Sequence, residues 1–410
     1  MFRSLFKGFP LGSLCMLVFS TSLFAAPADD LWGDWLQNQV DQHPEVVAAK
    51  DNMKSGLSLA DGQDQPLYNP ELETEFEREG EDSNFRVGVN QTIDWWDKSD
   101  IRQQRAAYSR QSARSTFELV RQRKTAEAIS ALIEWHSAKL SAQLASEQES
   151  QLGTLLEMIK ERQNAGDLGQ LDAELTYLDL SQKLNVTAQA QVRFQQSEAQ
   201  LKELLPNWSA EWANIPTRFW KEHDDNQAVK LSEDHPSIVA SRAAWEMLRK
   251  EADLIRQDAK AEPSIGINAG RSGDDDVVAL SFSIPLNVRN NYSAETRAAA
   301  QHALAAESSY LAVRRKLQYT VEAAQAALSG YRQHYQRWQS LMKGRAASSA
   351  KLLKTQWLSG DVSTPEYLIS LQQRAEGLLA GIELQTRYRL AYVNWLLQTG
   401  QINTALKQVR

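Results

Sequence analysis

The feature that most constrains this chain is an internal duplication. Residues 43–49 read His-Pro-Glu-Val-Val-Ala-Ala, residues 235–241 read His-Pro-Ser-Ile-Val-Ala-Ser, and the offset between them is about 192 residues. Further matches at nearly this offset pair Pro70 with Pro263, Arg105 with Arg297, and Gly166-Asp167 with Gly360-Asp361. Because the matching positions are turn and boundary residues, the repeat unit is a whole assembly of elements, far longer than an ordinary solenoid repeat. We therefore divide the chain into a first repeat at residues 27–225 and a second at 226–410.

The N-terminal segment has the layout of a secretory signal. Two basic residues, Arg3 and Lys7, precede an apolar run at residues 11–24, and three alanines follow within four residues. The alternative of a membrane anchor is disfavoured because the run is shorter than the roughly 20 residues that span a bilayer. We expect a signal peptide at residues 1–26, and its removal takes the only cysteine, Cys15, with it. A disulfide scaffold, a thiolate metal site and a lipid anchor on cysteine are then excluded.

Charge and motif content exclude several classes of function. Loss of the two basic signal residues changes the formal charge from −7 to −9, and an acidic chain without a basic cluster is a poor nucleic-acid binder. No Gly-rich phosphate loop, nucleophile elbow or histidine-centred acid/base set is present. The six histidines show no paired spacing on one helix face. We expect no catalytic residue, no metal site, no cofactor and no nucleic-acid partner.

Most of each repeat is predicted to be a long antiparallel helical hairpin. No proline lies between Pro70 and Pro206, and residues 99–165 are rich in Ala, Gln, Glu, Arg and Leu, which favour helices. At 1.5 Å per residue such a helix is on the order of 100 Å long. Glycine-containing turns after residues 164 and 358 reverse the chain, so we place the hairpins at 99–205 and 294–398. A shorter helix containing each His-Pro pair precedes them.

Two strands are predicted between the short helix and the hairpin of each repeat, about 71–79 and 85–93, and about 264–271 and 277–285. Apolar and polar residues alternate along all four. The first strand has glutamate at every second position, which puts five carboxylates on one face: Glu71, Glu73, Glu75, Glu77 and Glu79.

Each strand has about nine residues, the length of a tilted membrane strand. Four strands cannot close a barrel, and an open sheet edge has unpaired backbone groups that lipid does not tolerate. Either the sheet is soluble with capped edges, or several chains pool their strands. Three chains would supply twelve strands, above the minimum of about eight for a membrane barrel.

The ordered set of features resembles the TolC-like outer-membrane efflux proteins: an exported chain, a duplication, two strands and a long hairpin per repeat, and Arg162-Gln163-Asn164-Ala165-Gly166 at the first tip. The resemblance covers essentially the whole chain after the signal. The segment from Asn69-Pro70-Glu71-Leu72 to Arg102 and Arg105 is most similar to the CzcC branch, which serves cobalt, zinc and cadmium resistance.

This resemblance implies an α+β membrane protein that forms a homotrimer, with a 12-stranded barrel in the outer membrane of a Gram-negative bacterium and a large periplasmic helical tunnel. It implies an exit duct of a tripartite efflux system, with a periplasmic adaptor (a membrane fusion protein) and an inner-membrane pump, here a heavy-metal cation pump of the RND type. Alternative cargoes are drugs, or proteins in type I secretion. An alternative of another class is a soluble periplasmic coiled-coil scaffold.

The resemblance also suggests site residues on the helical hairpins. Asp172 and Glu366 each lie six residues after the tip glycine, where family members narrow the closed end of the tunnel. The alternative is that both are ordinary acids at a helix N-terminus, which interact with the helix dipole. A second acidic ring is in doubt, because the corresponding positions hold Leu175 and Ile369. The expected adaptor-docking residues at the tips are Arg162, Gly166, Asp167, Leu168, Gly360, Asp361 and Val362.

The strands carry the remaining candidates. The five glutamates of the first strand are expected to face the lumen, either as a cation-favouring lining or as an ordinary polar face. Trp95 and Trp96 follow the second strand, where an interfacial aromatic belt would lie. The alternative for these tryptophans is a soluble core.

Overall fold

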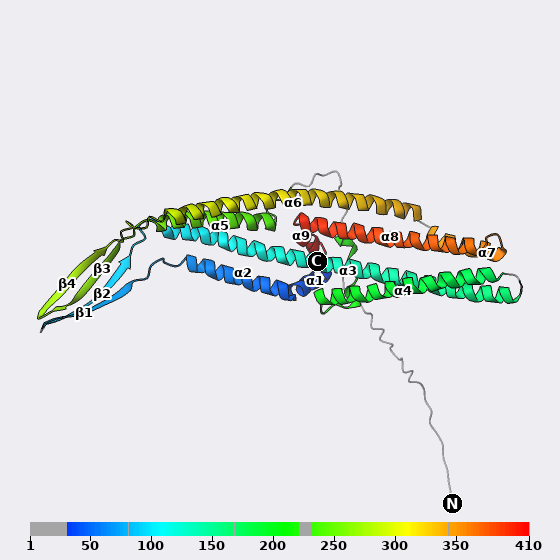
Figure 1. Ribbon diagram of the computed structural model, residues 1–410, viewed down its shortest axis with the longest axis horizontal. Helices are drawn as coiled ribbons and strands as arrows, with labels where there is room; N and C mark the ends of the chain where they lie inside the picture. The colour runs from blue at the N-terminus through cyan, green and yellow to red at the C-terminus, as the bar shows by residue number, and fades with distance from the viewer. Residues whose placement is uncertain (1–30, 81, 167–168, 221–230, 343–344, 410) are drawn as a thin grey trace, which may run out of the picture.

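The computed structural model describes residues 31–80, 82–166, 169–220, 231–342 and 345–409. The molecule is a long rod with a sheet at one end, helices along its length and two helical tips at the other end (Figure 1). The predicted signal peptide at residues 1–26 lies outside the described residues, as do Asp167 and Leu168 of the first tip.

The elements follow the same order in both halves of the chain. The first half contains α1 (Trp32–Gln42), α2 (Pro44–Gln63), β1 (Glu71–Glu79), β2 (Asp82–Thr92), α3 (Lys98–Asn164) and α4 (Gln170–Leu204). Two short 3₁₀ helices, η2 (Ala210–Trp212) and η3 (Thr217–Phe219), lie in the connection. The second half contains α5 (Pro236–Asp258), β3 (Ser264–Ser272), β4 (Asp275–Ser283), α6 (Ser293–Met342), α7 (Arg345–Ser359), α8 (Thr364–Gln398) and α9 (Ile402–Lys407). The outgoing arm of the second hairpin, expected as one helix, is therefore described as α6 and α7.

The duplication extends to individual hydrogen bonds. His43 and His235 are the N-cap residues of α2 and α5, and their Nδ1 atoms accept from the backbone N–H of Glu45 at 3.2 Å and of Ser237 at 3.1 Å. Each ring nitrogen satisfies one of the amide groups that a helix start leaves unpaired. The following proline occupies the first helical position, where its missing N–H costs nothing. Both histidines are thus explained by helix capping.

The tips of the two hairpins also share their backbone conformation. Gly166 ends the first hairpin's outgoing helix with φ +83°, and Gly360 ends the second with φ +82°. This left-handed conformation carries a steric penalty for residues with a Cβ atom, which explains why glycine recurs at both positions.

The strands form one antiparallel sheet in the order β1-β2-β3-β4. The first hairpin turn is tighter than the predicted loop at residues 80–84, because Glu79 pairs with Asp82 and the strand β2 begins there. The second turn is equally short, since Ser272 pairs with Asp275. A glycine with positive φ begins each turn, as two-residue hairpins require.

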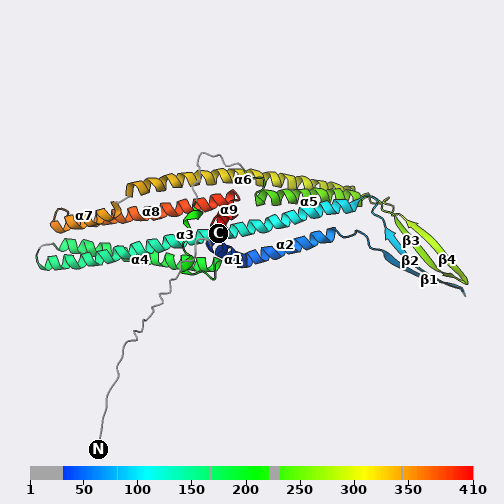
Figure 2. The same cartoon turned by 180° about the vertical axis from the view of Figure 1, so that it is seen from behind.

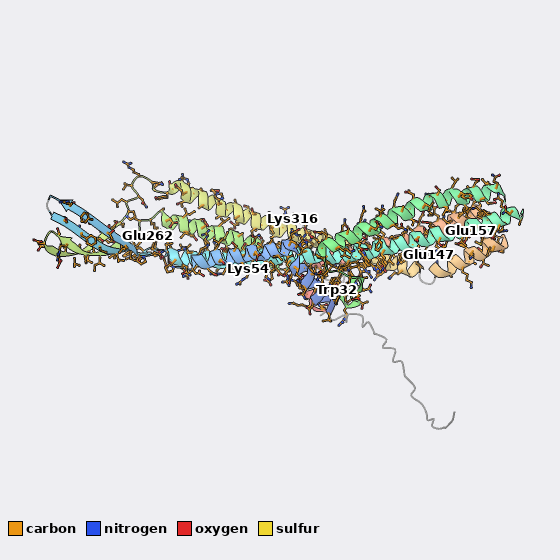
Figure 3. The ribbon with its side chains drawn as sticks, turned by 90° about the horizontal axis from the view of Figure 1, so that it is seen from below. Trp32, Lys54, Glu147, Glu157, Glu262 and Lys316 are labelled. Carbon is orange, nitrogen blue, oxygen red and sulfur yellow. The ribbon has the colours of Figure 1, made fainter. Side chains whose placement is uncertain are left out.

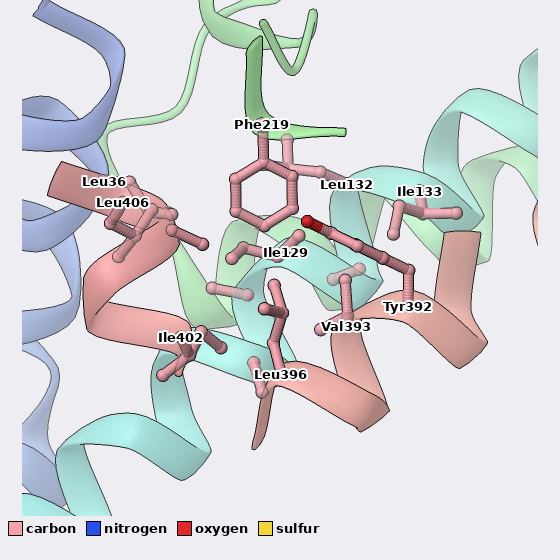
Figure 4. Close-up of a cluster of buried hydrophobic side chains, with 14 of the residues drawn as sticks. Leu36, Ile129, Leu132, Ile133, Phe219, Tyr392, Val393, Leu396, Ile402 and Leu406 are labelled. Carbon is pink, nitrogen blue, oxygen red and sulfur yellow. The ribbon is translucent and has the colours of Figure 1, made fainter. Parts of the chain in front are cut away.

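The main hydrophobic core lies at the middle of the rod, where α1, α9 and the connection between the repeats pack around α3 and α8 (Figures 1 and 4). Aromatic rings fill much of it. Trp212 stacks on Trp35 at a centroid distance of 4.9 Å, and Trp208 meets Trp135 edge-on at 4.9 Å. The tryptophans of the connection thus pack against helices. We call this cluster the waist core.

Figure 2 shows the same arrangement from behind, with the sheet and the tips at opposite ends of the rod. Among the described residues, none of the helices combines the length and the apolar character needed to cross a membrane.

Candidate functional site

The two faces of the sheet differ in chemistry, although Arg271 and Asp276 form an ion pair at the turn end of the more apolar face. Alternation and register place ten large apolar side chains on one face, all exposed: Leu72, Phe76, Phe85, Val87, Val89, Ile265, Ile267, Val278, Leu280 and Phe282. Leu280 is 81% exposed, and Val278 is 74% exposed. An apolar patch of this extent on a protein surface marks a contact with lipid or with another protein. We call it the apolar face.

The opposite face, here the polar face, carries the glutamates of β1. Glu71, Glu73, Glu75 and Glu77 are exposed on it, and Arg86 is the only basic residue that the four strands place there. Glu75 pairs with Arg86 at 3.3 Å. Glu79, the fifth glutamate of the row, is the last residue of β1. The polar face is therefore strongly negative.

A chain of hydrogen bonds crosses the polar face from strand to strand. Asn90 of β2 donates its Nδ2 to Glu73 Oε2 of β1 at 2.8 Å, and its Oδ1 accepts from Ser281 Oγ of β4 at 3.2 Å. Asn268 of β3 approaches the same hydroxyl at 3.5 Å. We call these four side chains the polar belt.

The polar belt passes over two glycines. Asn90 pairs with Gly266, and Gly88 pairs with Asn268, so each amide lies opposite a residue that has no side chain. A Cβ atom on Gly266 would lie 1.7 Å from Asn90 Oδ1, and one on Gly88 would lie 1.5 Å from Asn268 Oδ1. The two amides therefore occupy the space that side chains at 266 and 88 would fill.

All connections between sheet and helices meet at residues 259–263, the segment between α5 and β3. The backbone carbonyl of Ala259 accepts from Asn287 Nδ2, that of Ala261 from Trp96 Nε1, both at 2.8 Å, and that of Pro263 from the N–H of Ile93 at 2.9 Å. Each of these bonds fixes a different part of the chain to one short segment. This segment therefore links the sheet to the connections that lead into α3 and α6.

A buried charge pair reinforces this joint. Lys98, the first residue of α3, places Nζ 3.1 Å from Glu262 and 2.9 Å from Asp258. Tyr68 donates its hydroxyl to Glu262. Burial raises the pKa of Glu262 above its ordinary value, because desolvation disfavours the carboxylate. Figure 3 shows Glu262 where the helices give way to the strands.

The predicted interface tryptophans lie at the same joint, three and four residues beyond the end of β2. Trp95 is largely exposed, whereas Trp96 donates to Ala261 and has Lys260 Nζ 4.4 Å above its ring. Trp96 is therefore fixed to the joint by a hydrogen bond and a cation–π contact, whereas the ring of Trp95 is exposed.

Exposed apolar residues also follow the two edges of the helical layer. On one edge α2 and α4 pack on α3, and on the other edge α6 packs on α5 and α8 (Figures 1 and 2). Exposed large side chains on the first edge include Val47, Leu59, Leu171, Leu178, Leu184 and Val192, and those on the second include Leu304, Leu311, Tyr319 and Leu341. The spacing of seven residues between Leu171 and Leu178, and between Leu304 and Leu311, is typical of coiled-coil seams.

The two tips are joined to each other. Trp357 of α7 is buried, stacks on Tyr367 of α8 at 5.2 Å and donates to Thr364 Oγ1 at 3.2 Å. Arg162 of α3 lies over the same indole at 5.6 Å, so this predicted docking residue also has a contact inside the protomer. Gly166, Gly360 and Asp361 are exposed, and Val362 is half-buried against the tip cluster.

The two candidate constriction acids differ in their surroundings. Glu366 forms a capping box with Ser363: its carboxylate accepts from the Ser363 N–H at 3.0 Å and from the hydroxyl at 2.7 Å. The hydroxyl and backbone bonds hold the pKa of Glu366 below its ordinary value. Asp172 is half-buried in the first turn of α4, and its backbone N–H bonds to Gly169 O at 3.3 Å. Glu366 therefore starts its helix as well as lying near the tip.

Sequence reasoning did not identify Asn90, Asn268 or Trp357. For Asn90 and Asn268, the available signal was the presence of glycines at polar positions of the two central strands, opposite the asparagines. Trp357 gave none, since its contact with Arg162 joins two hairpins that are far apart in the sequence. No group of three or more His, Cys, Asp or Glu residues in the described part of the chain is arranged to hold a metal ion.

Comparison with solved structures finds a close likeness in fold. The outer-membrane channel OprN matches with a TM-score of 0.73 at 14% identity, over 91% of each chain. The CmeC outer-membrane channel of Campylobacter jejuni matches with a TM-score of 0.71 at 14% identity, over 97% of this chain and 94% of that one. The MtrE outer-membrane channel of Neisseria gonorrhoeae, solved in its open state, matches with a TM-score of 0.71 at 13% identity, over 92% and 90%.

No protein-family model and no curated protein matches the chain. Its fold is that of these channel proteins, which confirms the predicted class of a duplicated chain with two strands and a long hairpin per repeat.

Proposed function

We propose that this protein is the outer-membrane exit duct of a tripartite efflux system. The observation that carries the proposal is the sheet, which exposes an apolar face on one side and a negative polar face on the other. A membrane barrel needs this division, with apolar residues toward lipid and polar residues toward the lumen. A soluble coiled-coil scaffold, the alternative, has no use for ten exposed apolar side chains.

Three copies close the barrel. Within the described residues β1 pairs only with β2 and β4 only with β3, so each protomer has two free strand edges. β1 lies on the same side as α2 and α4, and β4 on the same side as α6 (Figure 1). One protomer's β4–α6 edge then joins the next protomer's β1–α2–α4 edge, a head-to-tail contact that forms a ring when the rotation closes.

Crosslinking of the purified protein in mild detergent tests this assembly. We expect products that stop at three chains, together with outer-membrane residence on cell fractionation. A protein that stays monomeric and soluble without detergent would refute the duct and favour the scaffold.

We assign the adaptor contact to the tips, because they are farthest from the sheet and are built alike. Arg162, Gly166, Gly360, Asp361 and Val362 belong to this surface; Asp167 and Leu168 complete the assignment from the sequence. An inner-membrane pump then supplies the cargo through the adaptor.

We assign the closed end of the tunnel to the same region, with Asp172 and Glu366 toward the threefold axis. The hydrogen bonds from Ser363 lower the pKa of Glu366, and this supports a ring of carboxylates that attracts cations. Block by divalent cations from the periplasmic side, measured on single channels, should weaken when Glu366→Gln is combined with Asp172→Asn. Unchanged block would leave both acids as helix-start residues and move the charge filter to the polar face of the barrel.

The resemblance to the CzcC branch favours a heavy-metal cation pump as partner, and the negative polar face suits a cationic cargo. The competing cargoes are drugs and, in type I secretion, proteins. In a deletion strain, increased toxicity of cobalt, zinc or cadmium indicates a metal cargo, and increased toxicity of dyes or detergents indicates a drug cargo. Loss of a secreted protein from the medium indicates a protein cargo.

A further inference from the structure

The glycines beneath the polar belt need an explanation, because glycine is unfavourable inside a strand. Glycine in a strand interior weakens the strand, because it has no side chain to pack and loses more backbone entropy on folding. A close backbone contact explains one such residue: a Cβ atom on Gly270 would lie 1.9 Å from the carbonyl oxygen of Phe85. Gly266 differs, because the three nearest atoms to its Cβ position belong to the side chains of Asn90 and Ser281.

The absence of a side chain at Gly266 therefore makes room for the Asn90 amide and not for a neighbouring backbone. The Asn90 side chain lies across β3 and is held at both ends, by Ser281 Oγ at 3.2 Å and by Glu73 Oε2 at 2.8 Å. The reciprocal pair repeats the arrangement one step along the sheet, with Asn268 over Gly88. This second pair differs in two respects: a Cβ atom on Gly88 would also lie 2.8 Å from the backbone oxygen of Ile267, and Asn268 shares the Ser281 hydroxyl with Asn90.

We propose that Gly88 and Gly266 determine the clearance of the barrel lumen by letting Asn268 and Asn90 lie flat against its wall. The inference rests on the proposed function, in which the polar face lines the lumen. Three protomers would place six such pairs around the barrel. A side chain at position 266 would displace the Asn90 amide, and the open direction is toward the lumen. The glycines are thus specificity-determining residues that set the size of cargo the barrel admits.

If the proposal is correct, the effect of a side chain at position 266 on the lumen width depends on the residue at position 90. A simple packing role of Gly266 predicts no such dependence. Gly266→Ala adds one methyl group, yet it should narrow the lumen by the size of a displaced amide. Asn90→Ala in the same chain should restore the width, because no amide is left to displace. Ala269→Val enlarges a side chain of the same strand on the apolar face and serves as the matched control.

Polymer exclusion in planar bilayers measures the clearance. Polyethylene glycols of graded mass are added to the side on which the barrel opens, and the largest polymer that still enters is recorded for each trimer. We expect Gly266→Ala to lower this limit by at least one step of the series, and Gly266→Ala with Asn90→Ala to return to the wild-type limit or above. Ala269→Val should keep the wild-type limit.

The proposal would be overturned if the same largest polymer enters wild type and Gly266→Ala. It would also be overturned if Gly266→Ala with Asn90→Ala still excludes polymers that enter the wild type. If Gly266→Ala fails to form trimers, Gly88→Ala is compared with Gly88→Ala plus Asn268→Ala. The Ile267 backbone oxygen, 2.8 Å from a Cβ atom at position 88, is common to both variants, so a larger polymer limit in the double variant supports the proposal and equal limits overturn it. A wild-type protein that forms no channel would instead refute the proposed function, so the two failures are distinguishable.

Discussion

The waist core buries its apolar side chains, whereas the sheet leaves its apolar side chains exposed. At the waist, Phe219 is 1% exposed and contacts its neighbour Trp220 as well as Trp32 and Tyr392, which come from opposite ends of the chain. In the sheet, side chains of similar size remain exposed, with Leu280 at 81%. The waist finds its partners inside one chain, whereas the sheet needs partners that one chain does not supply. The difference separates what stabilises the protomer from what the assembly and the lipid must cover.

The largest expected effect is at the waist. Phe219→Ala removes a buried aromatic ring and should lower the free energy of unfolding by about 3–5 kcal/mol, since the cavity adds to the lost burial. Denaturant unfolding of the detergent-solubilised protein measures it. The loss should be the same in detergent and in lipid, because the waist contacts neither. A loss that appears only in lipid would contradict the separation of the two regions.

A charge on the apolar face should have the next largest effect, and only in a membrane. Leu280→Arg should cost about 2–4 kcal/mol if the position lies near the bilayer midplane. Heat-resistant trimers in outer-membrane fractions provide the measurement, and Ala279→Arg, one residue away on the polar face, is the matched control. Equal trimer yields for the two variants would show that the faces do not differ in exposure to lipid.

The tips resemble the sheet rather than the waist core, because they too expose surface that a partner is proposed to cover. Val362→Asp should abolish export while trimers still assemble, since a charge would enter the proposed docking surface. Val362→Thr keeps the shape without a charge and should retain export. Growth of a complemented deletion strain on the transported compound reports the result. Export that survives Val362→Asp would remove the tips from the docking surface.

The smallest effect concerns pH and the cap of α5. Burial lowers the pKa of His235, despite a contact at 3.4 Å with Leu397 O that opposes the shift, and its Nδ1 accepts a hydrogen bond only when neutral. The unfolded chain then binds the proton more readily, so stability should fall as the pH drops below the ordinary histidine pKa of about 6.5. We expect a loss of at most about 1 kcal/mol, the scale of an N-cap.

Thermal unfolding at pH 8 and pH 5.5 tests this prediction. His235→Asn keeps a capping side chain without a titratable ring, so it should reduce the pH dependence. An unchanged pH dependence in His235→Asn would assign the effect to other groups.

Local patterns were sufficient to predict much of the fold. The alternation at residues 264–271 indicated a strand, and β3 covers Ser264–Ser272; the long run without proline indicated a helix, and α3 covers Lys98–Asn164. These features follow from backbone sterics and from side-chain period, which act over a few residues. The hairpin turns were less well predicted, because their length depends on cross-strand pairing such as Glu79 with Asp82.

The sequence by itself determined the duplication, the helical hairpins, the alternating strands and the glutamate row of β1, since each depends on neighbours in the chain. Only the tertiary structure decided which residues meet across it: Asn90 with Gly266, Lys98 with Glu262, Arg162 with Trp357. Those contacts join residues 164 to 195 positions apart. No local period encodes such a pairing, because it arises from how two repeats pack side by side, and the packing energy is shared among many contacts at once.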